Sequence, residues 1–137
     1  MGKFSKPLEY LKQEIEKPRS KPPLVIFDID DTLVRYHTQT PNSEVVKFYH
    51  QVANLGYHIV ILTARLQFLE SITIDQLEYF GLNDYDKIIF RRMQESDYGK
   101  YKLVQRKKLA KIYDIVANVG DMDHDFFGGY NGMIIQV

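Results

Sequence analysis

The chain has 137 residues, enough for one domain with a single hydrophobic core. Lys plus Arg and Asp plus Glu both number 18, so the formal net charge is zero and gives no general attraction to nucleic acid or to a charged membrane. The absence of cysteine excludes disulfides and thiol catalysis and fits a reducing compartment, so we expect a cytoplasmic protein.

The start of the chain predicts a helix followed by a lead-in segment. Apolar residues recur at helical spacing within residues 7–17, and prolines between residues 18 and 23 then end the helix. This segment has no apolar run long enough for a signal peptide or a membrane span, so we expect no membrane partner. We therefore divide the chain into an N-terminal helix with its proline-rich lead-in, residues 1–23, and a main domain, residues 24–137.

Within the main domain, predicted strands alternate with predicted helices. Apolar runs rich in Val and Ile are typical of buried parallel strands, and they fall at residues 24–29, 58–63, 86–90, 115–119 and 133–137. We expect helices at residues 43–54, 67–80 and 100–113, and loops at 35–41 and 91–99. Such alternation forms right-handed βαβ units. It predicts an α/β fold, a three-layer Rossmann-like parallel sheet of about five strands.

Acidic residues follow two of the predicted strands, at the strand ends where parallel sheets carry their functional side chains. Carboxylates that converge from two strands form a hard oxygen site suited to Mg²⁺. With the cation present, one carboxylate can attack phosphorus while another carries the leaving-group proton, and a hydroxyl and a lysine can hold phosphoryl oxygens. These parts predict phosphoryl transfer through an aspartyl-phosphate. The acids are Asp28, Asp30 and Asp31 after the first strand, and Asp121, Asp123 and Asp125 after the fourth.

The order of these residues resembles the haloacid dehalogenase-like (HAD) phosphohydrolases. Four motifs of that superfamily have counterparts over residues 24–137: Asp28-x-Asp30-x-Thr32, Thr63 at the end of HIVILT, a lysine before the fourth strand, and Gly120-Asp121 with Asp125. The stretch YKLVQRKKLAKIYDIVANVGDMDHDFFGGYNG resembles the acid phosphatase branch, subfamily III, which includes plant acid phosphatases, their storage-protein relatives and bacterial class B enzymes. The resemblance implies that residues 24–137 are a HAD-like catalytic domain.

The resemblance also implies a role for each acid. Asp28 would be the nucleophile and a Mg²⁺ ligand, and Asp30 the general acid and base, with its backbone carbonyl on the metal. Asp121 would be a further metal contact, and Asp125 would support the metal through water. Thr63 would hold a phosphoryl oxygen. We expect Asp31 to face solvent or to cap the turn.

Helical spacing selects the lysine among five candidates. Lys102 and Arg106 lie four residues apart on the arc that faces the sheet, and Lys102 is in the first turn, near the predicted site. The other basic residues of this helix fall on a solvated arc. Arg106 would contact substrate, support the site or pair with an acid. Arg65 and Arg91 are candidates for substrate binding, with surface ion pairs as the alternative.

Substrate access follows from the spacing of the motifs. Between Thr32 and Thr63, and between Thr63 and Lys102, the chain is too short for a cap domain, so we predict an open site walled by Tyr36, His37 and residues 91–99. An open site suits phosphoproteins or nucleic acid ends. It also suits small substrates if a second subunit of a homo-oligomer, or the N-terminal helix, covers it as a lid.

We therefore predict a Mg²⁺-dependent phosphomonoester hydrolase of nucleotidase or acid phosphatase type, acting on a small phosphomonoester such as a nucleotide. A polynucleotide 3′-phosphatase is the alternative enzyme, favoured by the open site and by the patch of Lys107, Lys108 and Lys111. A non-catalytic phosphate-binding or storage protein is the alternative of another class.

Overall fold

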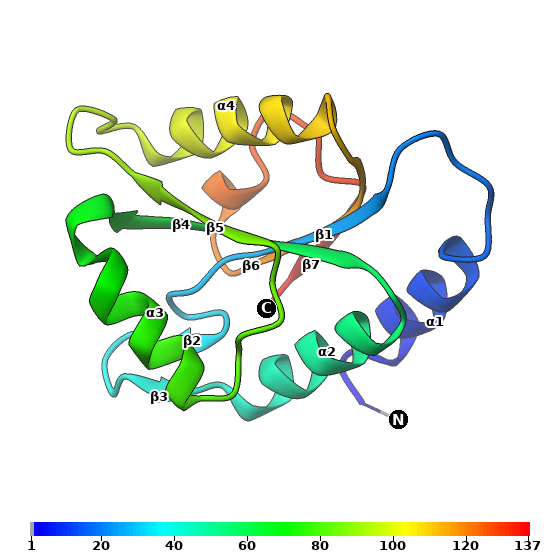
Figure 1. Cartoon of the computed structure of the whole chain (residues 1–137), viewed down its shortest axis with the longest axis horizontal. Helices are drawn as coiled ribbons and strands as arrows, with labels where there is room; N and C mark the ends of the chain where they lie inside the picture. The colour runs from blue at the N-terminus through cyan, green and yellow to red at the C-terminus, as the bar shows by residue number, and fades with distance from the viewer. Residues whose placement is uncertain (1) are drawn as a thin grey trace.

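A five-stranded parallel sheet forms the centre of this computed structural model, which describes residues 2–137 (Figure 1). Its strands lie in the order β5-β4-β1-β6-β7 and every neighbouring pair is parallel. The predicted α/β fold and its sheet of about five strands are confirmed. The strands are β1 (Pro23–Phe27), β4 (His58–Leu66), β5 (Lys87–Arg91), β6 (Asp114–Gly120) and β7 (Met133–Gln136).

The strand order reverses next to β1, and this reversal positions the site. From β1 the chain moves outward through β4 to β5, then crosses back to β6 on the other side of β1. In an open α/β sheet, the loops that leave two strands at such a switch point diverge and leave space for a ligand. The residues that follow β1 and β6 therefore meet at one end of the sheet.

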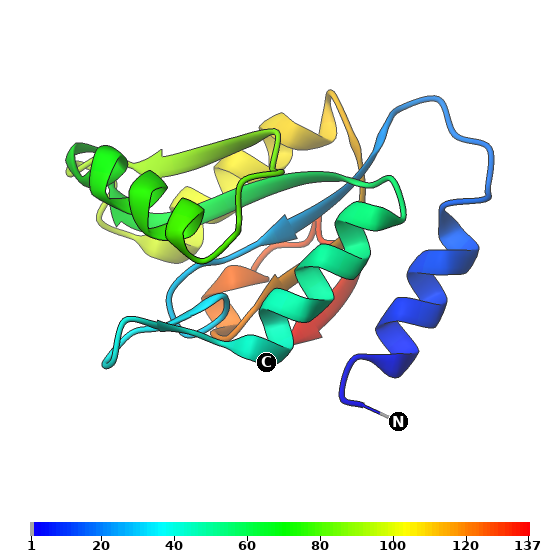
Figure 2. The same cartoon turned by 60° about the horizontal axis from the view of Figure 1, so that its bottom comes forward.

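Helices cover both faces of the sheet, as Figures 1 and 2 show. Alternate residues of β1 point to opposite faces. Val25 and Phe27 join the larger cluster beneath three helices, whereas Leu24 and Ile26 pack with Tyr101 against the fourth. The first three helices are α1 (Ser5–Glu14), α2 (Ser43–Asn54) and α3 (Glu70–Tyr79), and α4 (Tyr98–Ala110) covers the other face alone. A short 3₁₀ turn, η1 (Gln67–Leu69), precedes α3.

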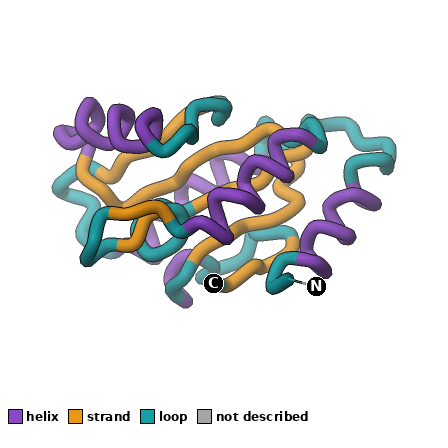
Figure 3. Tube along the Cα trace, turned by 90° about the horizontal axis from the view of Figure 1, so that it is seen from below, coloured by secondary structure: helices purple, strands orange, loops and turns teal. Residues whose placement is uncertain are grey.

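Helix α1 packs into the same core as the sheet. Its Leu11 is fully buried, and the Leu11 carbonyl accepts a 2.6 Å hydrogen bond from the Tyr57 hydroxyl. Phe4 stacks on Phe48 of α2 with 4.5 Å between ring centroids. Figure 3, viewed from this side, shows α2 across the near face of the sheet and α1, the helix next to the N-terminus, beside α2. In Figure 1, α1 lies at the end where β1 begins, away from the loops that follow the strands, so the fold does not place it as a lid.

The segment after β1 is a hairpin, where a loop was predicted. Strands β2 (Val34–Arg35) and β3 (Thr40–Pro41) pair antiparallel, and we call residues 34–41 the hairpin. Two-residue strands are too short to show an alternating pattern in the sequence. Gln39 in its turn has a φ of 55°, in the left-handed region.

No helix among residues 2–137 has both the length and the apolar composition required to cross a bilayer.

Candidate active site

A buried lysine bridges two acids at the end of β1 and β6. Lys102 Nζ lies 2.8 Å from Asp28 Oδ1 and 2.5 Å from Asp125 Oδ1. The three residues keep only 2%, 8% and 2% of their surface exposed, in the order Lys102, Asp28, Asp125. Of the lysines that the sequence offered, the structure thus brings Lys102 to Asp28, while Lys107, Lys108 and Lys111 are exposed.

The protonation of this cluster reflects burial and crowding of charge. Burial raises the pKa of Asp28 to about 7, because Lys102 only partly offsets the lost hydration and Asp125 adds repulsion. Burial alone would lower the pKa of Lys102, but the two carboxylates outweigh it and the pKa is raised. Lys102 is therefore held as the ammonium ion, but its single positive charge does not fully stabilise the ionised form of Asp28.

Asp121 and Thr32 complete the wall beside Asp28. Thr32 is fully buried, and its hydroxyl lies 3.2 Å from Asp28 Oδ2 and 3.5 Å from Asp121 Oδ1. Burial, with repulsion from Asp125, raises the pKa of Asp121. Thr32 belongs to the first motif but was not among the predicted site residues, and its contacts with Asp28 and Asp121 add it to the site.

Three carboxylates here fit a divalent cation. Asp28, Asp121 and Asp125 each offer an oxygen, all within 4.8 Å of one another. Three ionised carboxylates and one ammonium leave two uncompensated negative charges, which a dication would neutralise, and oxygen ligands suit Mg²⁺. Both Asp125 oxygens are already engaged, Oδ1 by Lys102 and Oδ2 by the Asp121 and Met122 amides at 3.1 and 3.0 Å. Asp28 and Asp121 are thus the better direct ligands, with Asp125 behind them.

The loop that carries Asp125 is held from beneath by buried polar side chains. Asn118 donates to the Asp125 carbonyl at 3.0 Å and to Asn131 Oδ1 at 2.8 Å. Arg106, fully buried, donates to the carbonyls of Asp125 at 2.8 Å and of Gly129 at 3.0 Å, and also to that of Phe127. Burial lowers its pKa, but an arginine stays charged. This geometry favours the supporting role that the sequence left open for Arg106 over substrate contact.

Gly120 is required by the approach of this loop to β6. A Cβ on Gly120 would lie 2.5 Å from Asp125 Oδ2 and 2.9 Å from Asp125 Cβ. A side chain there would push Asp125 away from the amides and the lysine that hold it. The glycine of the fourth motif is thus explained by close packing.

Asp30 is not part of the carboxylate cluster and pairs with Arg65. The Arg65 Nε lies 3.2 Å from both Asp30 oxygens, and its NH2 lies 2.8 Å from Oδ1. Asp30 keeps 31% of its side chain exposed, enough to reach a substrate at the open edge. For Arg65 the sequence left open substrate binding or an ion pair, and the structure shows an ion pair with Asp30, the candidate general acid.

Thr63 is fully buried near the end of β4. Its hydroxyl accepts from the Arg65 amide at 3.0 Å, and its carbonyl accepts from the Tyr101 hydroxyl at 2.8 Å. The register pairs Phe27 with Ile61, so Thr63 stands level with the residues just beyond β1. This is the place that the second motif implies for it.

Arg91 contacts backbone and an aromatic ring. Its guanidinium donates to the Ala64 carbonyl at 2.9 Å and the Glu95 carbonyl at 3.0 Å, and lies 4.5 Å from the centre of the Tyr98 ring. These contacts fix the 91–99 loop beside the site and favour a supporting role over substrate binding. Asp31, at the other wall, has a φ of 58° and accepts from the Tyr36 amide at 2.9 Å, so it caps the turn as expected.

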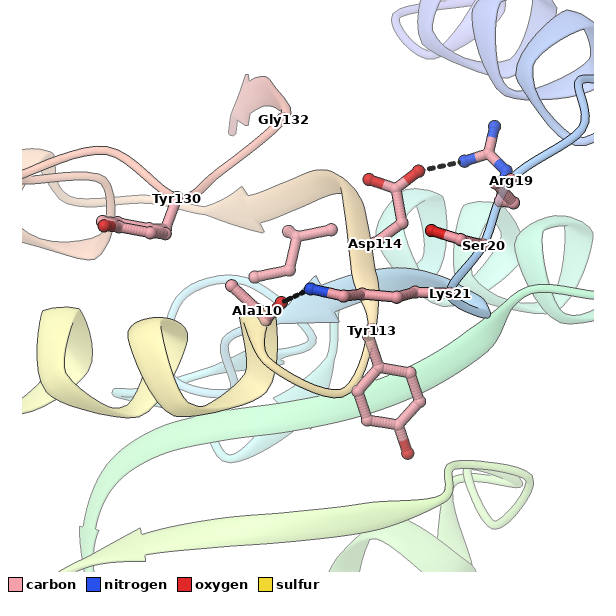
Figure 4. Close-up of a pocket in the computed structure, with 9 residues that line it drawn as sticks. Arg19, Ser20, Lys21, Ala110, Tyr113, Asp114, Tyr130 and Gly132 are labelled. Atoms are coloured by element: carbon pink, nitrogen blue, oxygen red, sulfur yellow. Dashed lines mark hydrogen bonds and ion pairs between the residues drawn. The ribbon is translucent and has the colours of Figure 1, made fainter.

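A pocket of about 350 Å³ lies at the opposite end of the sheet, where β6 begins (Figure 4). Arg19 bridges the chain across it: NH1 lies 2.5 Å from Asp114 Oδ2, and NH2 donates to the Glu14 carbonyl at 2.6 Å. Lys21 donates to the Ala110 carbonyl at the end of α4 at 2.8 Å. These contacts connect residues 19–21 to the sheet and to α4, far from Asp28, Asp121 and Asp125.

The fold and the placement of four motifs at one end of the sheet are those of the HAD superfamily. The sequence pattern of the HAD superfamily, subfamily IIIB (acid phosphatase), matches residues 34–136, and the chain belongs to this family. The match begins after the first motif and does not include Asp28 or Asp30, so the roles expected for these two residues rest on their positions in the fold.

Curated plant proteins are similar to the chain. Acid phosphatase 1 of Solanum lycopersicum is 33% identical over 110 residues, covering 76% of this chain and 42% of that protein. The stem 28 kDa glycoprotein of Glycine max is 30% identical over 93 residues, covering 65% and 37%. Vegetative storage protein 2 of Arabidopsis thaliana is 28% identical over 141 residues, covering 82% and 53%. The chain thus spans about a third to a half of the length of such relatives.

Among solved structures, a chain in the structure of the Pnkp1/Rnl/Hen1 complex superposes with a TM-score of 0.74 at 17% identity, covering 89% of this chain and 48% of that one. At this identity the likeness shows the fold alone.

Proposed function

We propose that this chain is a Mg²⁺-dependent phosphomonoester hydrolase that works through an aspartyl-phosphate on Asp28. The observation that carries the proposal is the contact of Lys102 with both Asp28 and Asp125, beside Asp121. A buried cation that bridges two acids has a structural role in many proteins, but here a third acid leaves negative charge in excess. That excess suits a dication and the phosphoryl group it would bind.

In the first step, an Asp28 oxygen forms a bond to phosphorus while the bond between phosphorus and the leaving oxygen breaks. Asp30 gives its proton to that oxygen. In the second step, a water oxygen attacks phosphorus, Asp30 takes the water proton, and the bond from Asp28 to phosphorus breaks. In this proposal Lys102 and Thr63 hold phosphoryl oxygens, and Thr32, whose hydroxyl lies 3.2 Å from Asp28 Oδ2, orients Asp28. Bound at Asp28 and Asp121, Mg²⁺ would neutralise the charge of the phosphate.

The substrate class that we propose rests on the acid phosphatase subfamily, because the open edge by itself admits both small and large phosphomonoesters. A small phosphomonoester, such as a nucleotide, is the substrate that we propose first. A 3′-phosphorylated oligonucleotide is the alternative, because the exposed Lys107, Lys108 and Lys111 could meet its backbone. A preference for the oligonucleotide over the mononucleotide would overturn the first choice.

The storage-protein alternative is supported by one specific observation: one relative is named as a vegetative storage protein. A storage role needs no nucleophile, whereas this chain keeps Asp28 in contact with Lys102. Hydrolysis therefore accounts for more of the site.

The deciding experiment is turnover of an aryl phosphate by the wild-type chain and by Asp28→Asn. We expect Mg²⁺-dependent turnover by the wild type, loss with EDTA, recovery on adding Mg²⁺, and no turnover by Asp28→Asn with an unchanged circular dichroism spectrum. Turnover by the variant would exclude Asp28 as nucleophile. A folded wild-type chain with no turnover of any phosphomonoester would favour the storage role.

A further inference from the structure

A chain of side-chain hydrogen bonds connects Asp30 to the hairpin. It runs from Asp30 to Arg65, then 2.8 Å from Arg65 NH1 to Gln76 Oε1 on α3, and 2.8 Å from Gln76 Nε2 to Gln39 Oε1 in the hairpin. Asp30 and Gln39, which follow β1, are thus connected to Arg65 and Gln76, which lie 35 and 37 residues further along the chain. None of the contacts is needed to build the sheet.

Arg65 is nearly saturated by these contacts. A guanidinium has five N–H groups. Nε and one NH2 hydrogen face Asp30, and NH1 donates to Gln76 and more weakly to Thr73, 3.4 Å away. At most one N–H is left for a substrate, and the Arg65 side chain is only 12% exposed. Its geometry is that of a residue that holds another side chain.

Asp30 has a particular need for such a partner. It is partly exposed, and it lies outside the cluster of Asp28, Asp121 and Asp125, so no contact with Lys102 fixes it. A carboxylate held at both oxygens by a planar guanidinium has a defined direction. The direction of a proton donor matters, because a misplaced catalytic group loses most of its effect.

We propose that Arg65 and Gln76 are positioning residues for the Asp30 carboxylate, and that Gln76 makes the hairpin part of that arrangement. The inference rests on the proposed function, in which Asp30 carries the leaving-group proton. Gln76 suits the task because its amide accepts from Arg65 with one end and donates to Gln39 with the other. A substrate that displaces the hairpin would thereby also disturb the group that protonates its leaving oxygen.

The test compares two substrates in single-turnover release of the leaving group. An alkyl phosphate has a strongly basic leaving oxygen and needs the proton, whereas 4-nitrophenyl phosphate needs it far less. For Arg65→Met we expect the alkyl rate to fall by about 10- to 100-fold and the aryl rate to change by less than about threefold, with little change in KM.

Variants of the glutamines separate the links. One net hydrogen bond is worth about 1 kcal/mol, so Gln76→Leu should slow the alkyl phosphate roughly fivefold. Gln76→Glu keeps the acceptor for Arg65 but loses the donor to Gln39. Gln39→Ala loses the same link together with the Gln39 hydrogen bond to the Tyr36 carbonyl, and both variants should slow the alkyl phosphate. Glu78→Gln, exposed on the same helix, is the matched control and should change neither rate.

Two results would overturn the inference: an equal loss for both substrates in Arg65→Met, which indicates general damage, or a raised KM for both, which indicates substrate contact. Hydrogen exchange gives a readout apart from turnover. Amides of residues 34–41 should exchange faster in Gln76→Leu than in Glu78→Gln, and equal exchange would exclude the tie to the hairpin. An inactive wild type would overturn the proposed function instead, while the exchange result would still report on the tie.

Discussion

Lys102 Nζ touches the carboxylates of both Asp28 and Asp125, although these acids follow different strands and lie 97 residues apart in the chain (125 − 28). Among the described residues, Lys102 is the only lysine or arginine whose charged group contacts either carboxylate. His124 lies 3.6 Å from Asp125 Oδ1, but it is charged only when protonated. The stability of the site and its chemistry therefore depend on the same three side chains.

Replacing Lys102 by methionine should destabilise the chain strongly. Removing one partner from a buried ionic cluster leaves uncompensated charge, at a cost of about 3–5 kcal/mol. Denaturant unfolding in EDTA measures this loss, and Mg²⁺ should restore part of it. Lys108→Met, exposed on the same helix, should stay within about 0.5 kcal/mol of the wild type. A loss in the control as large as in Lys102→Met would refute the assignment.

The stability of the metal-free chain should fall as pH rises through the titration of Asp28. Burial raises the pKa of Asp28 from its ordinary 3.8 to about 7. Between these values the folded state binds more protons than the unfolded state, so the free energy of unfolding decreases as pH increases. We expect wild-type stability to decline from about pH 4 to pH 7 relative to Asp28→Asn, measured in EDTA. Parallel curves for the two proteins would contradict this.

Mg²⁺ affinity should show the opposite trend. A cation at Asp28 competes with the proton on the carboxylate, so binding should tighten as pH rises toward and past about 7 and should release protons. Calorimetry in buffers of different ionisation enthalpy counts those protons. Binding that is independent of pH would argue against Asp28 as a ligand.

Gly120→Ala should damage the site without replacing a titratable residue. The added Cβ would lie 2.5 Å from Asp125 Oδ2, so Asp125 must move away from Lys102 and the loop amides. We expect a loss of about 1–3 kcal/mol of stability and weaker Mg²⁺ binding. Gly99→Ala is the matched control: its Cβ has 3.4 Å to the nearest atom and lies in α4, where alanine is favoured. If Gly120→Ala bound Mg²⁺ as tightly as Gly99→Ala, the packing argument would fail.

Arg19→Met should loosen the lead-in while leaving the site intact. The guanidinium loses its contacts with Asp114 and the Glu14 carbonyl, so we expect a loss of about 1–2 kcal/mol. Lys17→Met removes only an exposed pair with Glu14 and should cost less than about 1 kcal/mol. Aryl phosphate turnover at 25 °C should be unchanged in both, and a specific loss in Arg19→Met would connect this end of the sheet to the chemistry.

The sheet could be predicted from the sequence because strands buried in a parallel sheet consist of continuous runs of apolar residues. The burial of Lys102 and Arg106 could also be predicted, since helical spacing places both on the inner arc of α4. Asp28 and Asp121 could be placed at one end of the sheet because parallel strands share their carboxyl ends.

The partners of individual polar side chains could not be predicted in this way. Arg65 is bound to Asp30, and Arg106 to backbone carbonyls, because of distances between segments that only the folded chain defines. Gln76 and Gln39 carried no signal, since glutamines on a helix and in a turn are ordinary surface residues. The hairpin was missed because its strands have two residues each.

The pairing of β1 with β6 has a consequence for folding. Asp28 donates its amide to the Val119 carbonyl, and Phe27 pairs with Val119 across 92 residues of chain (119 − 27). Contacts of such long sequence separation require closure of a large loop and form slowly. During synthesis, Asp28 emerges long before Asp121 and remains hydrated until β6 docks. The cluster of Asp28, Asp121 and Asp125 should therefore assemble only when β1 pairs with β6, so a partly folded chain would lack the hydrolysis that we propose.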